Sequence, residues 1–72
     1  MIVIFKWPPK TNDPKEIIEL TFDNWSREIP TIGTDVNLNV DCEGDAIEKY
    51  ARVEKVVHYI GKTECVKIYL GS

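Results

Sequence analysis

The sequence predicts a single all-β domain, residues 1–72, folded as a small five-stranded antiparallel barrel or roll. Three observations support this fold class: apolar and polar residues alternate along several segments, β-branched and aromatic residues gather in those segments, and proline, glycine, asparagine and aspartate separate them. The chain has 72 residues, fewer than the roughly 100 to 150 of a typical domain, so it has room for one core.

The first two expected strands are residues 1–7 and 16–25. The first, MIVIFKW, is rich in branched and aromatic residues and is followed by two prolines, so it is too short for a stable helix. A polar, proline-containing loop comes next. In the second segment Ile18, Leu20 and Phe22 share one face of an alternating pattern, which is typical of a half-buried strand.

Residues 34–41 and 64–70 are the third and the last expected strands. In each, apolar side chains alternate with polar or amphipathic ones, so one face is expected to be buried. The inward side chains are expected to be Val36, Leu38 and Val40 in the third strand and Val66, Ile68 and Leu70 in the last.

The segment 45–60 allows a helical interpretation. Asp45 can cap a helix, Glu48 stands three residues later as in a capping box, and Gly61 can end the helix. An α+β fold of four strands and one helix would follow.

The same segment also allows an acidic loop to about Lys49 followed by a strand over residues 50–60. Val53 and Val56 break the alternation, which predicts a bulge near Lys55. We expect the strand, because valine, tyrosine and isoleucine dominate this stretch.

Three stretches support a family resemblance: PTIGTDVNL, residues 30–38; YARVEKVVHYI, residues 50–60; and, after a glycine turn, CVKIYL, residues 65–70. Together they resemble the second half of small, mostly uncharacterised bacterial and phage proteins with an SH3-like five-stranded barrel. The resemblance implies a strand over 50–60 and a bacterial, phage or mobile-element accessory protein. The acidic insert at 41–49 departs from the family pattern, and the family brings no catalytic residue.

Gly61-Lys62-Thr63 does not predict a phosphate-binding loop. Such a loop needs a glycine where Val56 stands and a helix after the threonine, whereas a strand-like segment follows here. A turn between two strands is the better interpretation.

The sequence predicts no metal site, no cofactor and no enzymatic activity. Asp41, Glu43 and Asp45 alternate as at the start of a calcium loop, but Ala46 stands where that loop needs glycine. One histidine and two separate cysteines cannot complete a four-ligand zinc site from those residue types. No spacing indicates a catalytic nucleophile or acid–base pair.

Charge and hydropathy indicate a cytoplasmic protein without a membrane segment. The apolar amino-terminal stretch ends after five residues, too short for a signal peptide or a membrane span. The net charge is −3, and residues 31–50 carry five acidic side chains and one basic. This excess opposes approach to a polyanion.

Two groups of residues are candidates for partner binding. The first is the acidic segment, with Asp41, Glu43, Asp45 and Glu48, which suits a protein partner with a basic surface. The second is an aromatic and basic stripe of Tyr59, Lys67 and Tyr69, which suits single-stranded nucleic acid. We expect a non-enzymatic interaction protein that binds a protein partner, with nucleic-acid binding as the alternative.

Overall fold

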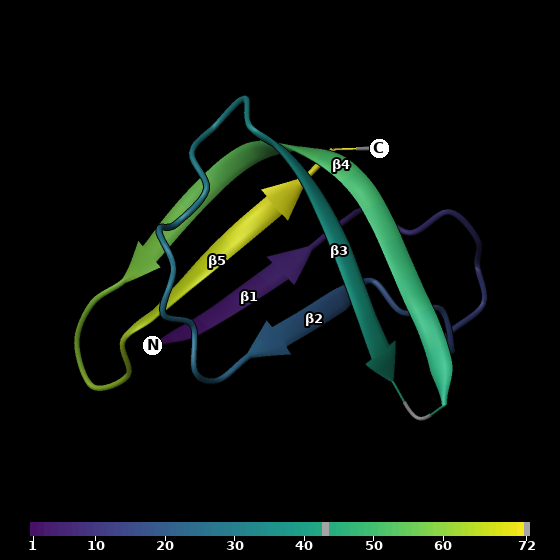
Figure 1. The fold of residues 1–72 in the computed structure, drawn as a ribbon, viewed down its shortest axis with the longest axis horizontal. Coiled ribbons are helices and arrows are strands. Elements are labelled where there is room, and N and C mark those ends of the chain that lie inside the picture. The colour runs from purple at the N-terminus through teal and green to yellow at the C-terminus, as the bar shows by residue number, and fades with distance from the viewer. Residues whose placement is uncertain (43, 72) are drawn as a thin grey trace.

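The computed structural model, which describes residues 1–42 and 44–71, shows one curled sheet of five strands (Figure 1). The strands are β1 (Ile2–Lys6), β2 (Glu19–Phe22), β3 (Asp35–Cys42), β4 (Asp45–Tyr59) and β5 (Cys65–Leu70). The all-β prediction is confirmed, and the helical interpretation of 45–60 is wrong. None of the described residues forms a helix long and apolar enough to cross a membrane.

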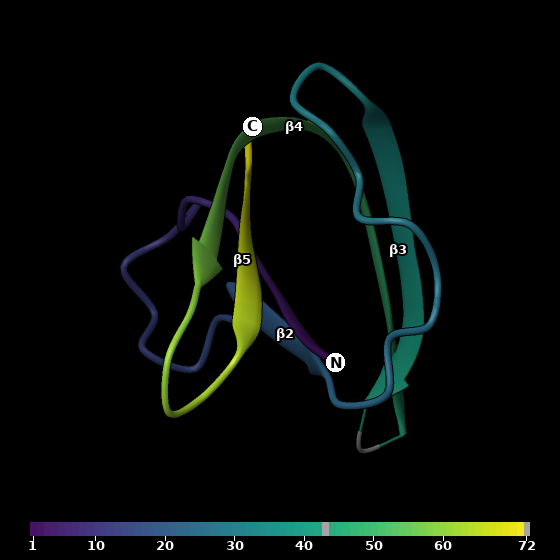
Figure 2. The same ribbon diagram turned by 90° about the vertical axis from the view of Figure 1, so that its left-hand side faces the viewer.

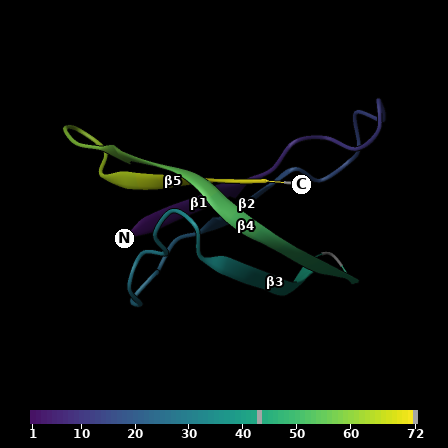
Figure 3. The ribbon, with the colours of Figure 1, turned by 90° about the horizontal axis from the view of Figure 1, so that it is seen from above.

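The sheet is a half-barrel that does not close. Its strand order is β2-β1-β5-β4-β3, so β2 and β3 are the two edges. Figure 2 shows β4 arching over the top of the fold, with β5 and β2 on one side of the arch and β3 on the other; Figure 3 shows the same curl from above. Because β2 and β3 do not pair, the concave side stays open between them.

The pairing of β1 with β5 is parallel, with Val3 beside Val66 and Phe5 beside Ile68. The other three pairs are antiparallel, so the sheet is mixed, and the expectation of a wholly antiparallel sheet is wrong. Hairpins fix the relative direction of strands that follow each other in the chain. No hairpin joins β1 to β5, so alternation alone could not give their direction.

The hairpin of β3 and β4 is longer than the sequence predicted. β4 begins at Asp45, which pairs with Cys42, and the ladder continues without a break to Asp35 and Arg52. The expected loop to Lys49 is therefore wrong from Asp45 onward. β4 continues through its polar residues because their backbone groups form hydrogen bonds to β3. These bonds do not depend on side-chain polarity.

A bulge divides β4 into two parts. The register shifts between Val53 and Lys55, which confirms the bulge predicted near Lys55. Because Glu54 is the extra residue, both Val53 and Val56 lie on the inner side of the sheet. Asp45 to Arg52 pair with β3, whereas Val53 and the residues after the bulge pair with β5.

β2 is shorter than the expected 16–25, because the chain on each side of it is held in other ways. The carboxylate of Glu16 accepts hydrogen bonds from the backbone N–H of Lys10 (2.8 Å) and of Thr11 (3.0 Å). These bonds lower the pKa of Glu16 and hold the loop that precedes β2. After the strand, the Trp25 N–H donates to the carbonyl oxygen of Met1 at 2.9 Å.

The core lies between the concave side of β1 and β5 and the inner side of β4. Its buried side chains are Val3, Phe5, Trp7, Leu38, Ala51, Val53, Val66, Ile68 and Leu70. An aromatic cluster extends it toward β2: the ring centroids of Phe5 and Phe22 are 5.7 Å apart, and Trp25 lies 5.5 Å from each. Such tilted or edge-on aromatic pairs add to the burial energy.

Candidate functional site

The hairpin formed by β3 and the first part of β4, residues 35–53, is here called the acidic arm. Its outward side chains alternate with inward apolar ones, and the exposed carboxylates belong to Asp35, Asp41, Asp45 and Glu48. Arg52 Nε lies 3.1 Å from Asp35 Oδ1, and this is the one ion pair among the residues that the structure describes. The other three carboxylates have no ion-pair partner among these residues; Asp41 and Asp45 lie beside the hairpin turn, and Glu48 lies opposite Asn39.

Three of the four acidic residues predicted as partner contacts lie on this arm. Asp41 and Asp45 are exposed next to the hairpin turn, and Glu48 is exposed opposite Asn39. Glu43 lies outside the described residues. Sequence analysis did not single out Tyr50, which is 70% exposed on the outer side of the arm, opposite Asn37.

The convex face of β1, β5 and the second part of β4 carries lysine and tyrosine side chains and is here called the lysine face. Tyr69 lies between Lys6 on β1 and Lys55 on β4 in the register of the sheet. The Nζ atoms of Lys55 and Lys67 lie 5.6 Å and 5.8 Å from the centroid of the Tyr69 ring, within the range of a cation–π contact.

The structure brings Lys67 and Tyr69 together but places Tyr59 at the other end of the face, opposite Cys65. Lys55 takes the place that sequence analysis had considered for Tyr59. The predicted bulge was the signal that could have identified Lys55, because a bulge near this position reverses the side to which each following residue points.

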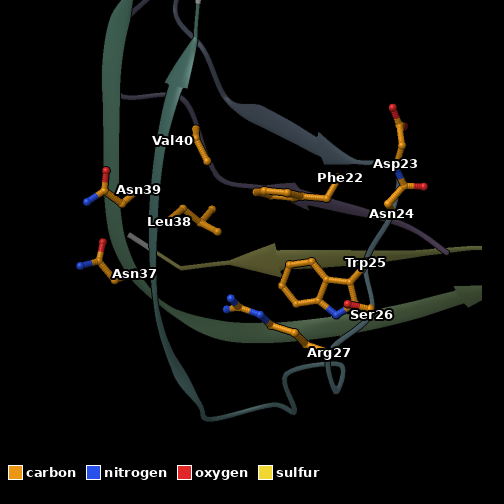
Figure 4. Close-up of a pocket in the computed structure, with 10 residues that line it drawn as sticks. All are labelled: Phe22, Asp23, Asn24, Trp25, Ser26, Arg27, Asn37, Leu38, Asn39 and Val40. Carbon is orange, nitrogen blue, oxygen red and sulfur yellow. The ribbon is translucent and has the colours of Figure 1, made fainter.

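A groove lies where the half-barrel stays open, with a volume of about 440 Å³. Its apolar wall consists of Phe22 and Trp25 on one side and Leu38 and Val40 on the other. Figure 4 shows Leu38 and Val40 pointing toward the two aromatic rings, whereas Asn37 and Asn39 point away.

Polar groups line the rim of this groove. Asp23, Asn24 and Ser26 lie on the side of the chain that follows β2. The guanidinium of Arg27 extends across the groove toward the Asn37 end of β3 (Figure 4). The sequence pattern does not indicate the groove, because the groove depends on the failure of β2 and β3 to pair.

The backbone of β3 has a free edge along this groove. The Val53 N–H donates to the Thr34 carbonyl oxygen at 2.9 Å. Inter-strand bonds alternate along an antiparallel pair, so residues 36, 38 and 40 also bond toward β4. The N–H and C=O groups of Asp35, Asn37, Asn39 and Asp41 therefore point away from β4, toward the open side.

Lys49 lies on the inner side of the acidic arm. Its Nζ is 5.9 Å from the centroid of the Trp7 ring. Burial, and then the charge of the nearby Lys10, lower the pKa of Lys49. Its ammonium group covers the core and does not neutralise the tip of the arm.

Within residues 1–42 and 44–71, no three histidine, cysteine, aspartate or glutamate side chains form a group that could hold a metal ion. Comparisons of the chain with protein-family models, with curated proteins and with solved structures give no match.

Proposed function

We propose that this protein binds a protein partner that presents a basic surface, and that the acidic arm is the recognition element. One observation carries the proposal: Asp41, Asp45 and Glu48 are exposed on a hairpin that extends beyond the core, and no cation pairs with them among the described residues. Uncompensated charges of one sign steer an oppositely charged partner and set its orientation.

The arm has the form of a binding element and not of a catalytic centre. Its described carboxylates are exposed, whereas the carboxyl groups of acid–base catalysts usually lie in a partly apolar pocket. A small half-barrel with a free edge at β3 suits recognition. As the sequence resemblance implied, we place the protein among small SH3-like accessory proteins of bacteria or phages, acting in the cytoplasm.

Single-stranded nucleic acid is the second candidate, and the lysine face favours it. Lys55 and Lys67 both approach the ring of Tyr69, with Lys6 on its other side. Stacking of bases on an aromatic ring among cations is the usual way to bind single strands without sequence preference. We place this candidate second because the net charge of −3 opposes the approach of a polyanion.

A matched pair of charge reversals tests the proposed function. The arm variant carries Asp41→Lys and Glu48→Lys, and the face variant carries Lys55→Glu and Lys67→Glu. The wild-type protein is used to capture partners from a bacterial lysate, and the partners are purified. The association rate of each partner with the wild type and with both variants is then measured at increasing salt concentration. We expect the arm variant to associate about tenfold more slowly and to lose the salt dependence, because exposed charges act mainly on association.

The face variant should behave like the wild type in this experiment. If the face variant loses the partner while the arm variant keeps both its rate and its salt dependence, the acidic arm is not the recognition element.

A further inference from the structure

The groove beside β3 has the features needed to accept one more strand. Four residues of β3, at alternate positions from Asp35 to Asp41, direct their backbone N–H and C=O groups toward it. The inward side chains of the same strand form one apolar wall, and Phe22 and Trp25 form the other. Its volume of about 440 Å³ lies within the range of peptide and ligand sites.

We propose that an extended segment of the basic partner pairs with the free edge of β3 and fills the open side of the half-barrel. This inference rests on the proposed function and specifies how the partner binds. The main-chain bonds supply affinity, and the alternate side chains supply specificity, as in other cases of strand addition to a sheet edge.

The register determines which side chains of the segment are buried. Residues directly opposite each other in a sheet point to the same face. The partner residues opposite Val36, Leu38 and Val40 therefore point into the groove and are apolar. Those opposite Asn37 and Asn39 point outward and are polar.

The charges along the groove, taken together with the direction of pairing, indicate which end of the segment is basic. Asp41 and Asp45 lie at the end of the groove nearest the hairpin turn, and Arg27 extends toward the Asn37 end. An antiparallel segment brings its amino end to the acidic tip and its carboxyl end toward Arg27. Antiparallel pairing is the more stable kind, so we expect this direction, and the segment is then basic at its amino end.

A second copy of the chain fits this edge less well. In a two-fold antiparallel pair of β3 strands centred on Leu38, Asp35 of each copy would lie opposite Asp41 of the other. Like charges directly opposite each other destabilise a sheet. Charged residues at an edge strand are also a common protection against self-association.

A synthetic peptide tests the inference. The probe is Lys-Lys-Val-Thr-Val-Thr-Val-Ser, and its control, Ser-Val-Thr-Val-Thr-Val-Lys-Lys, has the same residues in reverse order. Each is titrated into the ¹⁵N-labelled protein, and amide hydrogen exchange is measured. We expect the probe to bind about tenfold more tightly than the control, because its charges match the groove in the antiparallel direction.

Amide hydrogen exchange distinguishes strand addition from other modes of peptide binding. The amides of Asn37 and Asn39 should become protected when the probe binds, because only then do they find acceptors. The amides of Val36 and Leu38 already bond to β4 and should change little.

N-methylated peptides separate backbone pairing from side-chain contact without altering the protein. N-methylation of the threonine that pairs with Asn39 should weaken binding about tenfold, because it removes the hydrogen bond from that N–H to the Asn39 carbonyl oxygen. Methylation of the valine opposite Leu38 should have little effect, because that N–H points away from β3. In the protein, Asn39→Pro removes the backbone N–H of residue 39, which points to the free edge. It leaves the hydrogen bonds to β4 in place, because proline is tolerated at such edge positions.

Each contrary result overturns a stated part of the inference. Binding without new protection at Asn37 and Asn39, or equal effects of the two methylations, rules out strand addition. Tighter binding of the control peptide rules out the antiparallel direction. A dimer that protects Asn37 and Asn39 without peptide assigns the edge to a second copy. If no peptide binds but the arm still controls capture of the partner, strand addition is wrong and the proposed function stands. If no peptide binds and capture is independent of the arm, both strand addition and the proposed function are wrong.

Discussion

The acidic arm and the lysine face differ in charge although one strand, β4, contributes to both. Before the bulge, the outward residues of β4 include Glu48 and Tyr50 on the arm; after it, they are Lys55, Val57 and Tyr59 on the lysine face. The net charge of −3 therefore describes neither surface. On β4, a single extra residue, Glu54, separates the two surfaces.

The two regions also differ in what lies beneath them. The lysine face covers the closed part of the core, where Val3 and Ile68 are 0% exposed and Phe5 is 1% exposed. The acidic arm covers the open groove, where Leu38 is 6% exposed and its neighbours Val36 and Val40 are only half-buried. The first region is fully packed, and the second leaves part of its apolar surface exposed.

Truncation of one inward side chain in each region should give the largest difference. Ile68→Ala should lower the free energy of unfolding by about 4 kcal/mol, since it leaves a cavity in the fully buried part of the core. Leu38→Ala should cost about 2 to 3 kcal/mol, because solvent in the groove can occupy part of the space. Urea denaturation of both variants measures these values.

The outward neighbours serve as controls for these two variants. Lys67→Ala and Asn37→Ala should each change the free energy of unfolding by less than about 0.5 kcal/mol. If Asn37→Ala were as destabilising as Leu38→Ala, the assignment of the inner side of β3 would be incorrect.

A pair of tyrosine substitutions compares the two surfaces for nucleic-acid binding. If an unstructured oligonucleotide binds the lysine face, Tyr69→Ala should weaken it by about 1 to 3 kcal/mol through loss of stacking. Lys55→Ala should reduce the salt dependence by about one counterion. Fluorescence anisotropy with a labelled oligonucleotide measures both effects.

Tyr50→Ala is the matched control, because Tyr50 is an exposed tyrosine on the acidic arm. It should leave oligonucleotide binding unchanged. Oligonucleotide binding that is weakened equally by Tyr50→Ala and Tyr69→Ala would remove the distinction between the two surfaces.

The smallest expected effect concerns Glu16, which is distant in sequence from both surfaces. Hydrogen bonds from the backbone N–H groups of Lys10 and Thr11 lower its pKa. A carboxylate whose pKa is lower in the folded state stabilises the fold above its unfolded pKa of about 4.3, and this contribution is lost as the pH falls through the folded pKa.

Glu16→Gln should therefore be slightly less stable than the wild type at neutral pH and equally stable in strong acid. Urea midpoints across this pH range give the comparison. A difference that persists unchanged in strong acid would show that the charge of Glu16 does not hold the loop.

The sequence was most informative where side chains alternate. The inward positions of β3 and β5, and the bulge near Lys55, follow from the spacing of valine, leucine and isoleucine, and the structure has them as expected. The polar start of β4, from Asp45 to Lys49, could not be found in this way, because its pairing with β3 depends on backbone bonds and not on apolar side chains.

For the candidate surfaces too, only the features that depend on local sequence patterns could be predicted. The exposure of Asp41 and Glu48 and the proximity of Lys67 to Tyr69 could be expected from local patterns. The groove and the free edge of β3 could not, because they depend on which strands become neighbours in the sheet. Relations between strands far apart in the chain leave no local periodicity.

The parallel pair of β1 and β5 has a consequence for the order of events on the ribosome. At about 5 to 20 residues per second, β5 is synthesised roughly 3 to 12 s after β1. Until then β2 can cover one edge of β1, and Phe22 and Trp25 can pack against Phe5, but the edge of β1 that pairs with β5 has no partner. One edge of β1 therefore stays unpaired until β5 has been made, and the sheet can be completed only when translation has passed Leu70.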